Sequence, residues 1–154
     1  MFQDIYNYRK FSDKLYSGGM PTKEQLEDAV NYVTNVINLA PHTVDNALKD
    51  EENIVTELGM NYINIPVTWD LPTEENLQRF MDTMDQLQNE SVLVHCQANF
   101  RASSFITMYH ILRKGADIEA SLKLMREVWD DAVYPIWHEF ILEVIEDFGK
   151  MTNE

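Results

Sequence analysis

The sequence predicts an α/β fold built on a central, mostly parallel sheet of four to five strands flanked by helices. Three observations lead to this expectation. Short β-rich segments alternate along the chain with longer helical patterns. Two helices have clear Pro-Thr starts, at Pro21-Thr22 and Pro72-Thr73. Residues 91–95 form a continuous apolar run, as expected of a strand buried on both faces.

The first half of the chain contains three predicted strands and two predicted helices. The strands cover residues 14–17, 33–39 and 61–67. Gly18-Gly19 ends the first strand, and a helix opens at Pro21-Thr22, where Thr22 and Gln25 have the spacing of a capping box. The second helix covers residues 47–58 and stops at Gly59.

The second half is predicted to contain one strand, residues 91–95, and four helices. A helix begins at Pro72-Thr73, and another runs from about residue 101 to residue 114, directly after the strand and a turn. Two more helices close the chain. Apolar residues recur at helical spacing in three of these helices and are expected to form core: Leu77, Phe80, Met81, Met84 and Leu87, then Ile118, Leu122, Met125 and Trp129, then Trp137, Phe140, Ile141, Val144 and Phe148.

The size and composition indicate a single domain over residues 1–154. With 45% hydrophobic residues, the 154-residue chain can bury one core. No apolar stretch approaches the ~18 residues of a transmembrane helix, and the first residues do not resemble a signal peptide. The single cysteine has no internal partner for a disulfide, which suits a reducing compartment. We therefore expect a cytoplasmic protein.

The net charge of −14 bears on the possible partners. Nucleic-acid binding depends on basic residues that neutralise phosphates, so this balance opposes it, and it also disfavours anionic membranes. A phosphorylated small molecule or peptide stays possible, because its site needs only local positive potential. The acidic surface otherwise serves solubility.

The segment after Val94 contains the candidate chemistry. A buried strand leads to Cys96, a tight loop follows, and the next helix starts near Arg101. Unpaired N–H groups at a helix start attract anions and stabilise a thiolate placed there. The planar guanidinium of arginine suits bidentate contact with phosphate oxygens. A cysteine buried for structural reasons is the alternative, but its pairing with Arg101 favours a nucleophile beside an oxyanion binder. Such a thiol is expected to be exposed and open to oxidation.

Val94-His95-Cys96, followed by Arg101 and Ser103, resembles the signature of cysteine-dependent protein tyrosine and dual-specificity phosphatases. Over residues 15–115 the chain is similar to the compact bacterial group related to the phosphatase-like domain of beta-lactamase-hydrolase-like proteins. The matching segments are Leu15-Tyr16-Ser17-Gly18-Gly19-Met20-Pro21-Thr22, Val36-Ile37-Asn38-Leu39, Ile63-Asn64-Ile65-Pro66-Val67 and the His95 loop. The resemblance implies a tyrosine-phosphatase-like fold.

The candidate loop departs from most tyrosine phosphatases in three respects. Four residues rather than five separate Cys96 from Arg101, as also in the beta-lactamase-hydrolase-like group and in rhodanese-type sulfurtransferases. Asn99 replaces the usual loop glycine, although asparagine tolerates positive φ. Ala102 stands where a Ser or Thr commonly neighbours the thiolate, and Ser103 is a possible substitute. A shorter loop aims fewer amides at its centre.

The resemblance implies a phosphocysteine mechanism. Cys96 would attack phosphorus and water would hydrolyse the intermediate, while Arg101 and the backbone amides of the loop hold the phosphate oxygens. The candidate substrate-binding residues are Gln97, Ala98, Asn99, Phe100 and Ala102. His95 is expected to tune the thiolate through the neighbouring backbone, unless its role is purely structural.

Asp70 is the candidate acid for the leaving group. It follows a strand and precedes a helix, in the loop Thr68-Trp69-Asp70-Leu71-Pro72, where dual-specificity phosphatases keep their mobile acid. Its separation from Cys96 is shorter than usual, and charge compensation at a helix start is an alternative role. Glu74, Glu75 and Asp82 are weaker candidates because they fall on the helix itself.

Three functions follow from these residues. The leading one is a phosphate-monoester hydrolase acting on a phosphorylated peptide or small phosphate ester. The four-residue spacing keeps a rhodanese-like sulfurtransferase open, and the altered loop keeps a catalytically inactive phosphate-binding module open. No cofactor or metal is expected, since neither metal-ligand spacing nor a nucleotide-binding glycine loop occurs. The substrate identity and the oligomeric state do not follow from these patterns.

Overall fold

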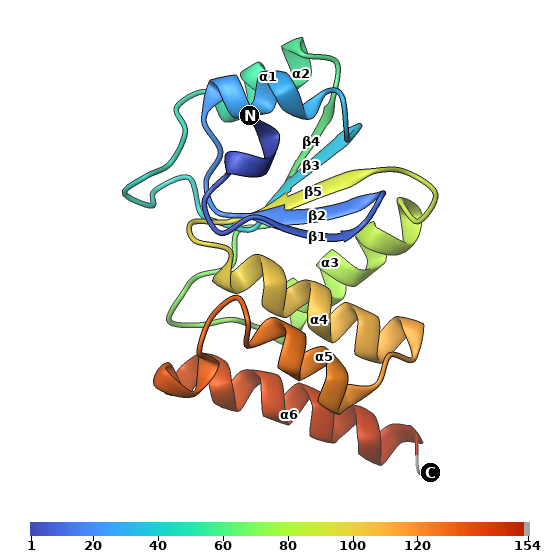
Figure 1. Ribbon diagram of the computed structural model, residues 1–154. Coiled ribbons are helices and arrows are strands. Elements are labelled where there is room, and N and C mark those ends of the chain that lie inside the picture. Colours follow the sequence, from blue (N-terminus) through green and yellow to red (C-terminus); the bar gives the residue numbers. More distant parts are fainter. Residues whose placement is uncertain (153–154) are drawn as a thin grey trace.

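The computed structural model describes residues 1–152 and contains one five-stranded sheet with the order β1-β2-β5-β3-β4. Strands β2, β5, β3 and β4 run parallel, and β1 pairs antiparallel with β2 at one edge. This arrangement confirms the predicted mostly parallel α/β sheet. Strand β5 lies in the middle, so its carboxyl end meets the ends of β2 and β3 (Figure 1).

The strands are short and the longest helices are in the second half. The strands are β1 (Arg9–Ser12), β2 (Leu15–Gly18), β3 (Asn35–Asn38), β4 (Asn61–Asn64) and β5 (Val92–His95). The α-helices are α1 (Lys23–Ala29), α2 (Glu51–Glu57), α3 (Glu74–Gln86), α4 (Phe100–Lys114), α5 (Ile118–Met125) and α6 (Pro135–Thr152). Two short 3-10 helices, η1 (Phe2–Asp4) and η2 (Asp131–Val133), complete the described chain.

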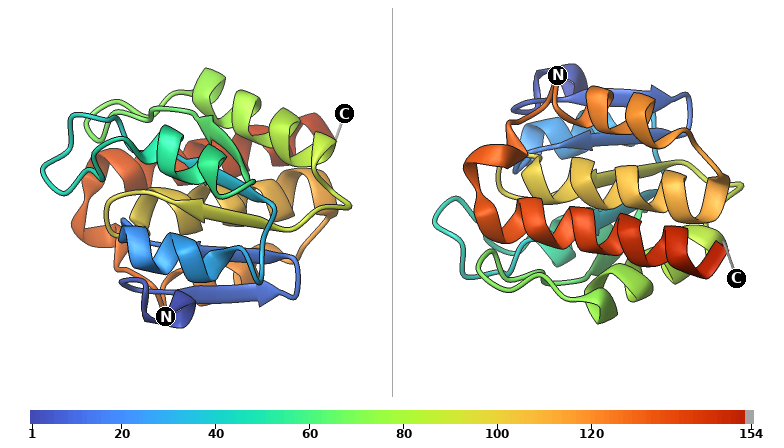
Figure 2. Two further views of the ribbon diagram at one scale, coloured as in Figure 1. Left: turned by 90° about the horizontal axis from the view of Figure 1, so that it is seen from above. Right: turned by 90° about the horizontal axis from the view of Figure 1, so that it is seen from below.

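Helices cover both faces of the sheet. Helices α1 and α2, with the N-terminal segment, lie on one face, and α3 and α4 lie on the other (Figures 1 and 2). Helices α5 and α6 pack on α4 on the side away from the sheet. Two hydrophobic clusters result, one per face. The larger contains the α3–α6 residues and Cys96, and the smaller is built around Phe2, Leu26 and Val36.

Both Pro-Thr segments begin helices as predicted. The Thr22 side chain accepts from the Gln25 N–H at 3.1 Å, and the Gln25 side chain accepts from the Thr22 N–H at 2.9 Å. Thr73 and Asn76 make the same reciprocal pair before α3. Such caps satisfy the first N–H groups of a helix, which lack intrahelical partners. The two helices that follow β2 and precede β5 are therefore specified locally.

Several elements differ from the predicted ones. Strand β1 was not predicted, because its residues are mostly polar and only alternate ones are partly buried. The helix expected over residues 47–58 begins only at Glu51, which leaves residues 39–50 as a loop. The predicted strands 33–39 and 61–67 shrink to β3 and β4, yet Ile65 and Val67 still donate to the Asn38 and Leu39 carbonyls at 2.9 Å. The extended pairing thus continues beyond the regular strands.

None of the helices within residues 1–152 has the length and apolar character needed to cross a bilayer.

Candidate active site

The central strand β5 places Cys96 at the carboxyl edge of the sheet. His95, its last residue, is paired with Gly18 of β2 on one side and with Asn38 of β3 on the other. The chain then turns through residues 96–99 and enters α4 at Phe100. This strand-loop-helix arrangement is the predicted one, and it directs the start of α4 towards the loop.

Three consecutive carbonyl groups of the loop accept hydrogen bonds from outside it. His95 Nδ1 donates to the Cys96 oxygen, and Asn7 Nδ2 donates to the Ala98 oxygen, both at 3.2 Å. The Gln97 oxygen accepts from the Met20 N–H and from Asn46 Nδ2, also at 3.2 Å. The peptide bonds of the described chain are trans, so each following N–H points away from these donors. The external contacts therefore orient the amides of the loop.

Gly18 and Gly19 lie where the chain is too closely packed for a Cβ. A Cβ on Gly19 would lie 3.0 Å from the Gln97 oxygen and 3.2 Å from the Ala98 Cα. A Cβ on Gly18 would lie 2.5 Å from Cγ2 of Ile5. Gly19 therefore lets its backbone pack directly on the backbone of the loop, and Gly18 leaves room for the side chain of Ile5.

Asn99 has the conformation that a loop glycine would have. Its φ is 72° and its ψ is 4°, in the left-handed region. The side chain is buried, and Nδ2 donates to the Asn7 carbonyl at 2.7 Å, while Asn7 donates back to Ala98. The asparagine thus supplies the turn and ties the loop to the N-terminal segment. The expectation that Asn99 tolerates positive φ is confirmed.

Arg101 lies beside the thiol and is almost fully buried, with 4% of its surface exposed. Its Nε donates to the Val67 carbonyl at 2.9 Å, and its guanidinium carbon lies 5.2 Å from the centre of the Trp69 ring. Burial lowers the pKa of the Arg101 guanidinium, while attraction to the Cys96 sulfur and a hydrogen bond to it oppose that effect. The cation is therefore held next to the candidate nucleophile.

The Cys96 thiol is buried rather than exposed, which corrects one expectation from the sequence. It belongs to the larger hydrophobic cluster, and it is not itself a lining residue of the adjacent hollow of about 510 Å³, which Gln97, Ala98 and Arg101 line. Four of the lining residues are aromatic and four belong to residues 97–101 of the loop and the start of α4. The lining residues are Tyr6, Met20, Asn46, Trp69, Gln97, Ala98, Phe100, Arg101 and Tyr134. A ligand in this hollow would contact the loop and Arg101 together.

Asp70 lies in the predicted loop but at its exposed side. The loop is fixed at two carbonyls, because Arg101 donates to Val67 and Trp137 Nε1 donates to Trp69 at 2.8 Å. Trp69 lines the hollow, whereas the side chain of Asp70 is exposed and is not part of the lining. The structure therefore brings the loop of Asp70, but not its carboxylate, into the site. The weaker candidates Glu74, Glu75 and Asp82 lie on α3.

The other predicted residues, Ala102, Ser103 and His95, are buried next to the loop. Ala102 is fully buried and offers no hydroxyl to Cys96. The Ser103 hydroxyl donates to the Asn99 carbonyl at 2.7 Å, so it supports the turn into α4 rather than facing the thiol. His95 is buried, and its Nε2 lies 2.5 Å from Oε2 of Glu51. Sequence reasoning missed Glu51, because it is 44 residues away from His95.

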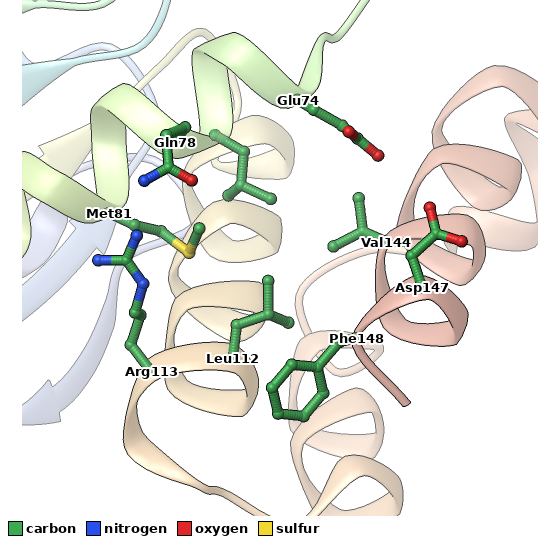
Figure 3. A pocket seen from close by; sticks show the side chains of 9 residues that line it. Glu74, Gln78, Met81, Leu112, Arg113, Val144, Asp147 and Phe148 are labelled. Atoms are coloured by element: carbon green, nitrogen blue, oxygen red, sulfur yellow. The ribbon is translucent and has the colours of Figure 1, made fainter. Parts of the chain in front are cut away.

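A second hollow lies between α3, α4 and α6, away from the signature loop (Figure 3). The side chains of Glu74 and Asp147 approach it from α3 and α6, and apolar side chains such as Met81, Leu112 and Val144 lie between them (Figure 3). Its lining includes Glu74, one of the weaker acid candidates, but not Cys96, Arg101 or Asp70. Throughout residues 1–152, no three His, Cys, Asp or Glu side chains are grouped to hold a metal ion.

Comparison with known proteins identifies the family. A family model described as a DSP-PTPase phosphatase fused to NAD+ kinase matches residues 3–134. The chain belongs to this phosphatase family. It is therefore a cysteine-dependent phosphatase, and the resemblance to protein tyrosine and dual-specificity phosphatases is confirmed. The membership favours this activity over the sulfurtransferase alternative. Among curated proteins, none matches the chain.

Several solved structures have a similar fold. The chain is 35% identical to a putative phosphatase (DUF442) from Shewanella putrefaciens CN-32, with a TM-score of 0.84 over 94% of this chain and 92% of that one. TpbA of P. aeruginosa is 17% identical, with a TM-score of 0.74 over 94% and 91% of the two chains. PTPMT1 in complex with PI(5)P is also 17% identical, with a TM-score of 0.76 over 94% and 98%.

Proposed function

We propose that this phosphatase hydrolyses phosphate monoesters through a phosphocysteine intermediate. The Cys96 thiolate attacks phosphorus, a sulfur–phosphorus bond forms, and the bond from phosphorus to the ester oxygen breaks. The leaving oxygen takes a proton from an acid. Water then attacks phosphorus, which releases inorganic phosphate and returns the thiolate.

The carrying observation is the position of Arg101 and the oriented loop around the thiol. Arg101 lies over the Trp69 ring and beside Cys96, and three consecutive loop carbonyls accept hydrogen bonds from residues outside the loop. The amides that follow, together with the start of α4, supply donors for the equatorial oxygens of the phosphoryl group. In this proposal Gln97, Ala98, Asn99, Phe100 and Ala102 contribute backbone rather than side-chain contacts.

We assign the leaving-group acid to Asp70. The support is its loop, which is anchored to Arg101 and Trp137 and places Trp69 in the lining of the hollow. Because the carboxylate itself is exposed, it reaches the leaving oxygen only when substrate fills the hollow or the loop tip turns inward. Asp45 is a useful comparison, since it adjoins Asn46, another lining residue, and is also exposed.

Phosphorylated peptides and small phosphate esters are the proposed substrates. Tyr6, Trp69, Phe100 and Tyr134 give the hollow aromatic walls, which suit an aryl or apolar group attached to the phosphate. Related folds have been solved with such ligands: TpbA with pTyr and PTPMT1 with PI(5)P. We propose the same broad class here, in a cytoplasmic setting and without a cofactor.

The proposal is tested by paired assays on the wild type and Cys96→Ser. We expect hydrolysis of p-nitrophenyl phosphate by the wild type and none by the variant, with no transfer of sulfur from thiosulfate to cyanide. Thiocyanate formation without phosphate release would support a sulfurtransferase instead. Phosphate binding without either reaction would support an inactive binding module.

The acid assignment needs substrates with different leaving groups. Asp70→Asn is expected to lower the rate by about 10²–10⁴-fold for an alkyl or phenyl phosphate, and by much less for p-nitrophenyl phosphate, whose leaving group needs little protonation. Asp45→Asn is the matched control and should leave both rates near the wild-type values. An equal loss on both substrates would remove Asp70 from this role.

A further inference from the structure

His95 is held between two hydrogen-bond acceptors beneath the loop. Its Nδ1 lies 3.2 Å from the Cys96 carbonyl oxygen, and its Nε2 lies 2.5 Å from Oε2 of Glu51. Both residues are buried, with 0% of His95 and 4% of Glu51 exposed. The ring therefore joins the start of α2 to the peptide that links Cys96 to Gln97.

The chemistry of the acceptors determines where the protons lie. A carbonyl oxygen only accepts, so His95 Nδ1 must carry a hydrogen in this arrangement. One further proton is shared between Nε2 and the Glu51 carboxylate, on whichever of the two atoms it resides. In either case the pair has no net charge: it is a neutral imidazole with a carboxylic acid, or an imidazolium in contact with a carboxylate. Such compensation is what a buried site requires.

The second oxygen of Glu51 is also fixed. Asn38 Nδ2 donates to Oε1 of Glu51 at 3.2 Å and lies 3.1 Å from the Tyr62 hydroxyl. Asn38 is the last residue of β3 and pairs with His95 in the sheet. The carboxylate thus has a partner on each oxygen, and its position is set by the strand that neighbours β5.

We propose that Glu51 is a positioning residue for the phosphatase reaction, acting through His95 on the Cys96–Gln97 peptide. The inference rests on the proposed function. By fixing the His95 ring, Glu51 keeps Nδ1–H directed at the Cys96 carbonyl, and the Gln97 N–H then points the opposite way, towards the bound phosphoryl group. Donation to the carbonyl also polarises the peptide and strengthens that N–H as a donor.

Two substitutions separate the position of the Glu51 side chain from its charge. Glu51→Asp keeps the charge but withdraws the carboxylate from His95 by about 1.5 Å, the length of one carbon–carbon bond. Glu51→Gln keeps the reach, since its oxygen can accept from Asn38 while its NH₂ donates to His95 Nε2. We expect kcat/KM to fall about 10–100-fold in the aspartate variant and to stay within about 3-fold in the glutamine variant.

Glu52 is the matched control, because it is the next residue of α2 and is exposed. Glu52→Asp and Glu52→Gln should both retain wild-type turnover. The opposite order at Glu51, with the aspartate variant active and the glutamine variant impaired, would overturn the proposal. Wild-type turnover in both Glu51 variants would overturn it as well, provided that thermal unfolding shows all the variants to be folded.

A spectroscopic measurement tests the geometry without turnover. In the ¹⁵N spectrum of histidine-labelled protein, the proposal requires a proton on Nδ1 of His95 in the wild type and in Glu51→Gln. An unprotonated Nδ1 would refute it even in an active enzyme. Absence of phosphatase activity in the wild type would instead count against the proposed function. The orthovanadate affinity of the two Glu51 variants would then decide whether Glu51 shapes the oxyanion site. Weaker binding by Glu51→Asp alone is the expected result, and equal binding by both variants would overturn the role.

Discussion

Asn99 provides the sharpest test of how the four-residue loop keeps its shape. At φ 72° its backbone is left-handed, where a Cβ costs about 1–2 kcal/mol. Its Nδ2 donates to the Asn7 carbonyl at 2.7 Å, while its Oδ1 is buried without a partner among the described residues. Asn99→Ala and Asn99→Gly both remove the side-chain amide, but only alanine keeps a Cβ. We therefore expect the glycine variant to be more stable by about 1–2 kcal/mol.

The comparison with the wild type follows from the same contacts. The lost hydrogen bond destabilises the glycine variant by about 1 kcal/mol, and removal of the unpaired buried oxygen offsets a similar amount. Asn99→Gly should therefore unfold within about 1 kcal/mol of the wild type. Urea denaturation monitored by tryptophan fluorescence measures these differences.

A helical asparagine serves as the control for this pair. Asn53 is exposed in α2, so glycine there should be about 1 kcal/mol less stable than alanine. The order of the two variants is thus expected to reverse between position 53 and position 99. Equal stability of Asn99→Ala and Asn99→Gly, or a more stable alanine variant, would refute the reasoning.

Two further predictions concern packing and pH. Gly19→Ala should reduce turnover while leaving the protein folded, because its Cβ would press on the Gln97 oxygen from 3.0 Å; wild-type kinetics would contradict this. Burial favours the protonated form of Asp131, but hydrogen bonds from Arg126 and His138, both at 2.9 Å, lower its pKa below the ordinary value. Its carboxylate therefore stabilises the fold above about pH 4, and this contribution is lost as the pH falls through the lowered pKa. Asp131→Asn should be less stable at pH 7, with the difference shrinking at pH 3 in urea titrations.

Local patterns in the sequence predicted most of the parallel sheet and the strand-loop-helix segment. The capping boxes at Thr22 and Thr73 act within four residues, and the apolar run of β5 reflects burial on both faces. These signals are short-range, so they are readable without the fold. Cys96 and Arg101 belong to the same class, because one loop brings them together.

The contacts missed from the sequence are long-range. Asn7 and Glu51 reach the loop from 92 and 44 residues away, and neither has a local pattern that marks it. Strand β1 is an edge strand with polar residues, so its alternation is weak. The burial of the Cys96 thiol was missed because it results from packing within the larger hydrophobic cluster, which joins residues far apart in the sequence.

These long-range contacts explain how a loop with one residue fewer can still be ordered. The Gln97 and Ala98 carbonyls accept from Asn46 and Asn7, which lie far away in the sequence, and the Cys96 carbonyl accepts from His95, whose ring contacts Glu51. The geometry of the candidate phosphate site is therefore set by the packing of the N-terminal segment, the loop over residues 39–50 and α2 against the end of β5. Substitutions that weaken the packing of any of these three segments should therefore lower the affinity for an oxyanion even while Cys96 stays buried. Vanadate affinity is the measurement that detects this change.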